Sequence, residues 1–153
     1  AAGVLGPLIE CCPSRLQVIN RSAARAVALV ERHRPWAEQH GVPLGAGGLE
    51  DAYDAFDIVV NASASSLVGA VVPVGAHVLR PGTLALDLMY GPASRGFLDW
   101  ASAHGASARD GLGMLVEQAA EAFWLWRGVR PHTAPVLESL RAQVQAELRG
   151  DGP

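Results

Sequence analysis

The sequence predicts an α/β fold, in which helices flank a parallel β-sheet and two further helices end the chain. Short apolar runs rich in β-branched residues alternate with longer segments of helical periodicity, and this alternation is typical of βαβ units. Glycine, proline and serine residues separate the segments. From residue 112 onwards the pattern is helical only. We therefore expect residues 1–110 to form the sheet domain and residues 111–153 to pack in a different environment.

The first predicted elements are a helix, a strand and a second helix. Residues 1–12 form an apolar helical segment, which Pro7 is expected to kink because proline lacks the backbone N–H of one intrahelical hydrogen bond. Residues 16–20 have the pattern of a strand, and Ser22 is expected to cap the helix that follows. The apolar residues that share one face of this helix are Ala26, Leu29 and Val30.

The middle of the chain predicts short elements and a polar loop. Residues 42–44 are expected to be a strand and residues 49–55 a short helix. Residues 58–60 are all apolar and β-branched, which predicts a strand buried on both faces. The polar residues 61–66 follow at its carboxyl end, where ligands bind in open parallel sheets.

The later elements follow the same alternation. A turn at Pro81-Gly82 leads into a strand at residues 83–88, and residues 96–104 are helical until Gly105 stops them. Residues 106–109 are the last predicted strand.

Two consecutive helices are predicted to end the chain, the second over residues 133–148. The residues at helical spacing in the first of them are Leu112, Leu115, Ala119, Ala122 and Trp126. The aromatic side chains expected in the core, or in a surface that packs on another domain, are Phe123, Trp124 and Trp126.

Composition and charge exclude several classes of partner. Twelve basic and fifteen acidic residues give a net charge of -3, so nucleic acid is not an expected partner. The apolar runs are shorter than the roughly 18 residues of a membrane span, so no membrane partner is expected. Cys11 and Cys12 are adjacent and are expected to be reduced thiols in a cytoplasmic protein. The five histidines are scattered, which predicts no metal site.

Two arginines after the first predicted strand form the most informative candidate site. Arg21 and Arg25 lie four residues apart at a helix start, where they can converge on one phosphate beside Asn20 and Ser22. Folds that bind NAD carry an acid near this strand end, whereas a basic residue accommodates the 2′-phosphate of NADP. The alternative is an exposed helix start with two solvated arginines, and spacing alone does not separate the two interpretations.

Further candidates follow the later strands. The amide and hydroxyl groups of residues 61–66 can bind a nucleotide or a hydroxylated substrate, or can simply form a turn. Asp87 and Tyr90 flank the end of another strand, where Tyr90 is either a substrate contact or a half-buried side chain. Gly111 lets the backbone approach a ligand closely, or belongs to a tight turn. Gln118, beside an apolar helix face, is either solvated or faces a polar cavity.

Four motifs together resemble the nucleotide-binding half and the C-terminal helices of the shikimate dehydrogenase family. In chain order they are Asn20-Arg21-Ser22, Asn61-Ala62-Ser63, Leu86-Asp87-Leu88-Met89-Tyr90-Gly91 and Asp110-Gly111-Leu112-Gly113-Met114-Leu115-Val116-Glu117-Gln118-Ala119. The resemblance implies a Rossmann-like domain whose first strand and glycine-rich loop would precede Ala1. It also implies NADP as cofactor and the reversible reduction of 3-dehydroshikimate to shikimate.

The resemblance also implies roles for individual positions. Those that match the family's clamp for the adenosine 2′-phosphate are Asn20, Arg21, Ser22 and Arg25. Those that match the loop beside the nucleotide are Asn61, Ala62 and Ser63. Leu88 and Gly111 match positions near the nicotinamide, and Tyr90 and Gln118 match side chains that contact substrate. Ser66 stands where the family usually has a glycine.

The catalytic lysine and aspartate of the family lie in an N-terminal substrate domain that has no counterpart in this sequence. We therefore assign no catalytic residue here, and the sequence contains no lysine. The two C-terminal helices are expected to pack toward that missing domain. The alternatives are a quinate/shikimate dehydrogenase with relaxed cofactor choice, a non-catalytic NADP-binding module, and a structural domain without a ligand.

Overall fold

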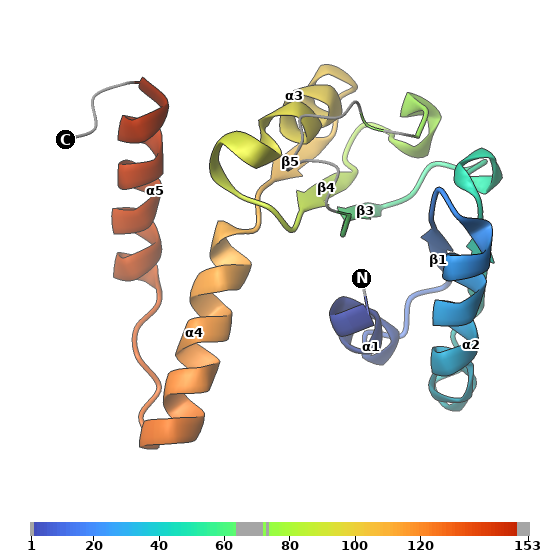
Figure 1. Cartoon of the computed structure of the whole chain (residues 1–153), viewed down its shortest axis with the longest axis horizontal. Coiled ribbons are helices and arrows are strands. Elements are labelled where there is room, and N and C mark those ends of the chain that lie inside the picture. The colour runs from blue at the N-terminus through green and yellow to red at the C-terminus, as the bar shows by residue number, and fades with distance from the viewer. Residues whose placement is uncertain (1, 64–71, 73, 150–153) are drawn as a thin grey trace. The chain divides into compact units, whose positions relative to one another are not determined.

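The computed structural model describes residues 2–63, 72 and 74–149, and the chain divides into two compact units (Figure 1). Unit 1 comprises Ala1–Ala55 and Pro73–Val78, and unit 2 comprises Phe56–Val72 and Leu79–Pro153. The strands formed by the described residues pair in two sheets, one in each unit, and every pairing is parallel. The predicted α/β class with parallel strands is therefore confirmed.

Unit 1 contains a two-stranded sheet and two helices. Its elements in chain order are α1 (Ala2–Glu10), β1 (Leu16–Ile19), α2 (Ala23–Gln39) and β2 (Leu44–Gly47). The strands pair in register from Leu16 opposite Leu44 to Ile19 opposite Gly47. Helix α2 packs on both strands and on α1.

The core of unit 1 forms where α1 and α2 meet the sheet. Its buried members are Leu5, Ile9, Leu29, Ala37 and Val42, and the partly buried Leu16, Val18 and Leu44 pack against them. The face predicted for α2 is confirmed, because Ala26, Leu29 and Val30 are all buried. Unit 1 therefore places the end of β1 and the start of α2 on a well-packed support.

Unit 2 contains a three-stranded sheet in the order β3-β4-β5, followed by two long helices. Its elements are β3 (Ile58–Asn61), β4 (Leu84–Asp87), the 3-10 turn η4 (Gly91–Ser94), α3 (Arg95–Ala103), β5 (Ser107–Arg109), α4 (Leu112–Arg127) and α5 (Ala134–Arg149). In the register, Asn61 lies opposite Asp87 and Leu86 lies opposite Arg109. The sheet thus aligns the carboxyl ends of three strands at one edge.

Two glycines end helices of unit 2 in the left-handed conformation, and the helix stop predicted at Gly105 is confirmed. Gly105 follows α3 with a φ of 79°, and Gly128 follows α4 with a φ of 69°. Glycine adopts this conformation without the steric conflict that a Cβ atom would introduce.

Several local predictions are wrong. The strand expected at residues 42–44 lies at Leu44–Gly47 instead, because the Val42 N–H donates to the Ala37 carbonyl and closes the end of α2. The helix expected at residues 49–55 is only a 3-10 turn, Leu49–Asp51. Ser22 occupies the N-cap position of α2, but its side chain makes no capping hydrogen bond.

One burial prediction is also wrong, and α4 buries a narrower stripe than its apolar spacing covers. Ile58 was expected in a strand buried on both faces, but its side chain is 52% exposed, and among the strands of the described residues β3 pairs with β4 alone. The apolar face predicted for α4 is largely exposed, and Trp126 reaches 81% exposure. The residues that α4 does bury are Leu112, Val116 and Ala120, which repeat every four positions and form one narrow stripe.

Candidate cofactor and substrate site

The carboxyl edge of the three-stranded sheet brings together predicted site residues from three segments of the chain. Asn61 ends β3, Leu88 directly follows β4, and Gly111 lies between β5 and α4. Two backbone hydrogen bonds hold these segments in contact: Leu88 N donates to the Asn61 carbonyl at 3.0 Å, and Gly111 N donates to the Met89 carbonyl at 2.8 Å. The structure therefore joins positions that are up to 50 residues apart in the sequence.

The side chain of Asn61 organises the turn that follows β3. Its Oδ1 accepts a hydrogen bond from Ser63 N at 3.2 Å and another from Ser63 Oγ at 2.7 Å. Its Nδ2 donates to Asp87 Oδ2 at 3.1 Å. Ala62, which is half-buried, lies inside this turn, whereas residues 64–66 of the predicted polar loop lie outside the described residues.

Position 111 requires a glycine because the backbone of Leu88 comes very close to it, and not because of the dihedral angles of Gly111. A Cβ atom built at Gly111 would lie 2.3 Å from the Leu88 carbonyl oxygen, far inside van der Waals contact. The side chain that any other residue adds would therefore push the two loops apart. The strand-end loops that contain Leu88 and Gly111 are consequently in direct contact.

The second group of predicted residues lies in unit 1, at the carboxyl end of β1. Asn20 Oδ1 accepts a hydrogen bond from Ser22 N at 3.0 Å, and Asn20 N donates to the Gly47 carbonyl at 3.1 Å. Arg21 and Arg25 are both exposed, and neither forms an ion pair or a hydrogen bond through its side chain with any described residue. Their positive charges are therefore not neutralised within the described part of the chain.

Two acidic side chains, Glu50 and Asp51, lie beside the end of β2, and the oxygens of Asp51 already accept hydrogen bonds. Asp51 Oδ2 accepts from Gly48 N at 2.7 Å, and Asp51 Oδ1 accepts from the Tyr53 hydroxyl at 3.0 Å. The bond to this carboxylate raises the pKa of Tyr53 above its ordinary value, because deprotonation would lose the bond and place two negative charges side by side. Asp51 therefore fixes the backbone that follows β2 through Gly48 and holds the Tyr53 hydroxyl.

The two predicted substrate contacts lie in exposed positions of unit 2. Tyr90 precedes η4 and is 43% exposed, and its hydroxyl bonds to no described residue. Gln118 lies on α4 and is exposed, so of its two predicted environments the structure has the solvated one. Both side chains can therefore reach a ligand outside the unit.

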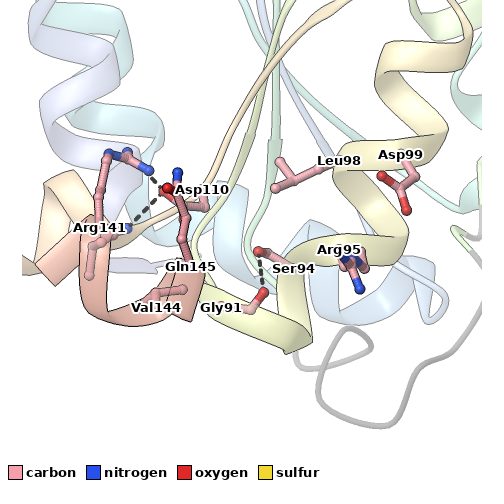
Figure 2. Close-up of a pocket in the computed structure, with 10 residues that line it drawn as sticks. Gly91, Ser94, Arg95, Leu98, Asp99, Asp110, Arg141, Val144 and Gln145 are labelled. Carbon is pink, nitrogen blue, oxygen red and sulfur yellow. Dashed lines mark hydrogen bonds and ion pairs between the residues drawn. The ribbon is translucent and has the colours of Figure 1, made fainter. Parts of the chain in front are cut away.

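A cavity of about 220 Å³ is lined by residues of η4, α3 and α5 and by Asp110 and Leu112, which flank Gly111 in the sequence (Figure 2). Arg141 on α5 donates through Nη2 to Asp110 Oδ1 at 3.1 Å, and Ser94 Oγ donates to the Gly91 carbonyl at 2.9 Å. The cavity wall carries two arginines and two aspartates, so its formal charges balance. The ion pair between Arg141 and Asp110 anchors α5 to the residue immediately before Gly111.

Sequence reasoning missed two groups that the structure connects to the candidate site. Asp87 was noted only for its place at a strand end, yet it is completely buried and bonded to Asn61. Arg141 was not considered, because no pattern relates it to Asp110 at a separation of 31 residues. The sequence does contain a signal for Asp87, because this aspartate directly follows the apolar run 84–86.

Two further expectations concern metals and membranes. No group of three or more histidine, cysteine, aspartate or glutamate side chains is placed to hold a metal ion among the described residues. In the same part of the chain, no helix combines the length and apolar character needed to cross a membrane. Cys11 and Cys12 are both exposed and free.

The close approach at Gly111 yields a stability prediction. Gly111→Ala is expected to lower the free energy of unfolding by about 2 kcal/mol or more, because the new methyl group overlaps the Leu88 carbonyl. Gly113→Ala is the matched control: its Cβ would meet only Leu137 Cδ2, at 4.0 Å, and alanine favours the helix by up to about 1 kcal/mol. Urea unfolding of both variants measures the difference, and equal stability of the two would contradict the described contact.

Comparison with known proteins places this geometry in a family. Residues 111–141 match the model of the shikimate 5′-dehydrogenase C-terminal domain. The NADP(+) shikimate dehydrogenase of Methylibium petroleiphilum is 66% identical over 145 residues, which are 95% of this chain and 49% of that protein.

Two solved structures have the same fold. An Ael1 enzyme from Pseudomonas putida is 41% identical with a TM-score of 0.77, covering 90% of this chain and 49% of the other. A shikimate dehydrogenase in complex with NADP+ is 27% identical with a TM-score of 0.76, covering 92% of this chain and 50% of the other. The chain belongs to the shikimate dehydrogenase family and spans about half the length of the curated relatives it matches.

Proposed function

We propose that this chain is the cofactor-binding part of an enzyme that reversibly reduces 3-dehydroshikimate to shikimate with NADPH. The observation that carries the proposal is the 66% identity, over 95% of the chain, to a protein named NADP(+) shikimate dehydrogenase. The resemblance of the four sequence motifs supports the same activity. Because the relatives are about twice as long, the complete activity belongs to the full-length protein and not to these residues alone.

The residues present fit a phosphorylated dinucleotide. Arg21 and Arg25 have guanidinium groups without partners among the described residues, and they lie at a helix start, where backbone amides favour an anion. Asn20 and Ser22 complete the proposed clamp for the 2′-phosphate. The residues that follow β1, from Asn20 to Arg25, include no acid of the kind that favours the free ribose hydroxyl of NAD.

In this proposal the carboxyl edge of the three-stranded sheet holds the reactive end of the cofactor. Asn61, Ala62 and Ser63 would line the nucleotide, and Leu88 and Gly111 would pack beside the nicotinamide. When bound, NADPH supplies a hydride for a ring ketone. Because Gly111 and Leu88 already touch, the surface they offer to the ring is formed before the cofactor binds.

Tyr90 and Gln118 would orient the substrate through hydrogen bonds. Both are exposed, and both carry groups that bond to hydroxyl or carboxylate oxygens. Proton transfer would fall to the lysine and aspartate that the family resemblance assigns to a substrate domain outside this chain. Apart from five histidines, this chain's basic side chains are arginines, which do not give up a proton near neutral pH.

We also propose the domain organisation that the sequence predicts. Residues 1–110 would be a Rossmann-like NADP-binding domain that is incomplete at its N-terminus, and residues 111–153 would pack toward the substrate domain. Within the described residues, β1 and β3 each pair on one side only, so each offers an edge to a further strand. The large apolar side chains that α4 leaves exposed are Leu115, Phe123, Trp124, Leu125 and Trp126.

A direct assay tests the activity. The full-length protein is expected to reduce NADP+ when given shikimate, and the absorbance of NADPH measures the rate. Quinate with either NAD or NADP serves as the comparison substrate. A preference for quinate would replace the proposed substrate, and inactivity on both acids combined with NADP binding would indicate a binding module.

The proposed phosphate clamp predicts a change in cofactor preference. Arg21→Asp in the full-length protein is expected to lower the ratio of kcat/KM for NADP to that for NAD about a hundredfold. The change removes a charge-assisted hydrogen bond and adds a repulsive carboxylate. Arg32→Asp, an exposed arginine about two and a half turns into α2, is the control and should leave the ratio unchanged. An unchanged ratio in the Arg21 variant would exclude the clamp.

The exposed face of α4 predicts a stability effect in the full-length protein. Trp126→Glu is expected to lower the melting temperature by several degrees, because a side chain proposed to be covered by the substrate domain becomes charged. Val27→Glu, at an apolar position of α2 that is 46% exposed, is the control and should change the melting temperature little. Equal melting temperatures for the two variants would show that the face stays in solvent.

A further inference from the structure

Asp87 is a completely buried carboxylate that the proposed chemistry does not use. It ends β4, is 0% exposed, and lies opposite Asn61 in the register of the sheet. Its two oxygens accept hydrogen bonds from different elements: Oδ2 from Asn61 Nδ2 at 3.1 Å, and Oδ1 from Met89 N at 2.9 Å. A buried carboxylate is costly unless such donors are held in place, so the site maintains these contacts at a stability cost.

On the side of β3, the carboxylate determines which way the Asn61 amide faces. The NH₂ group of Asn61 points to Asp87, so its oxygen is left facing Ser63 and accepts both Ser63 N and Ser63 Oγ. A carboxylate without a proton only accepts hydrogen bonds, so the reversed amide would place two oxygens against each other. Asp87 therefore sets the orientation of the turn proposed to line the nucleotide.

On the side of β5, the same carboxylate supports the loops proposed to face the nicotinamide. Met89 N donates to Asp87, and the Met89 carbonyl accepts the N–H of Gly111 at 2.8 Å. Leu88 stands between Asp87 and Met89 in the sequence, and the carbonyl oxygen of Leu88 lies against Gly111. One buried side chain therefore connects both loops with the Asn61 turn.

We propose that Asp87 is a positioning residue for NADP, acting through Asn61 on one side and through Met89 and Gly111 on the other. The inference rests on the proposed function and deepens it. Asp87 itself contacts no cofactor in this proposal. Its negative charge and its two fixed oxygens hold the nucleotide turn and the nicotinamide loops in one mutual arrangement before the cofactor binds.

Asp87→Asn in the full-length protein tests the proposal. The amide is close in size to the carboxylate but has only one accepting oxygen, so its NH₂ group must face either the Asn61 NH₂ or the Met89 N–H. We expect the KM for NADP, and the Kd for NADP measured by calorimetry, to rise about tenfold, the effect of losing one hydrogen bond to a charged group. The KM and the Kd are both measured well below the melting temperature of the Asp87→Asn variant, where this variant is folded.

Thr83→Val is the matched control. Thr83 is also 0% exposed and adjoins β4, but it lies at the opposite end of the strand, where its hydroxyl donates to the Phe56 carbonyl and accepts from Arg80 N. Loss of the Thr83 hydroxyl should lower the melting temperature without changing the KM for NADP more than about twofold. The contrast separates a positioning role from a general loss of stability.

The outcomes distinguish this inference from the proposed function. If the wild type uses NADP but Asp87→Asn changes its KM no more than Thr83→Val does, Asp87 is only structural and the inference is wrong. If the wild type neither binds NADP nor oxidises shikimate, the proposed function fails and the inference fails with it. Should Asp87→Asn give no folded protein, Asp87→Ser is judged by the same criteria, because its hydroxyl can still accept from Met89 N.

Discussion

Parallel pairing of β4 with β3 on one side and β5 on the other is the constraint on which the candidate site depends. Parallel strands end at the same edge of a sheet, so three chain segments deliver their carboxyl ends together. The backbone bonds of Leu88 to Asn61 and of Gly111 to Met89 continue the contacts beyond the strands. Asp87 can bridge to Asn61 because the register places these two residues opposite each other.

The two groups of candidate residues differ in physical character. In unit 2 the polar groups bond to one another, so Asn61, Ser63 and Asp87 are already oriented. In unit 1 the guanidinium groups of Arg21 and Arg25 find no partner within the described chain. Fixed polar groups suit the positioning of a reactive ring, whereas uncompensated charges suit the capture of a phosphate, so each group suits the part of the cofactor that it is proposed to bind.

The C-terminal helices combine a small buried area with a specific anchor. Helix α4 buries a narrow stripe that includes Val116, and it leaves large side chains such as Trp126 exposed. Helix α5 is tied to the site by the Arg141 and Asp110 ion pair. Apolar side chains of this size gain free energy when they are covered, which supports the proposed packing on the rest of the enzyme.

The sequence by itself determined the α/β class, the places of most strands and the glycine that ends α3, because these depend on local periodicity and on backbone conformation. Its motifs also located the candidate residues. Only the tertiary structure decided how exposed Ile58 is and which stripe of α4 is buried. It alone joined Asp87 to Asn61 and Arg141 to Asp110. These contacts link residues far apart in the chain, and no local pattern encodes which distant groups the sheet register and helix packing bring together.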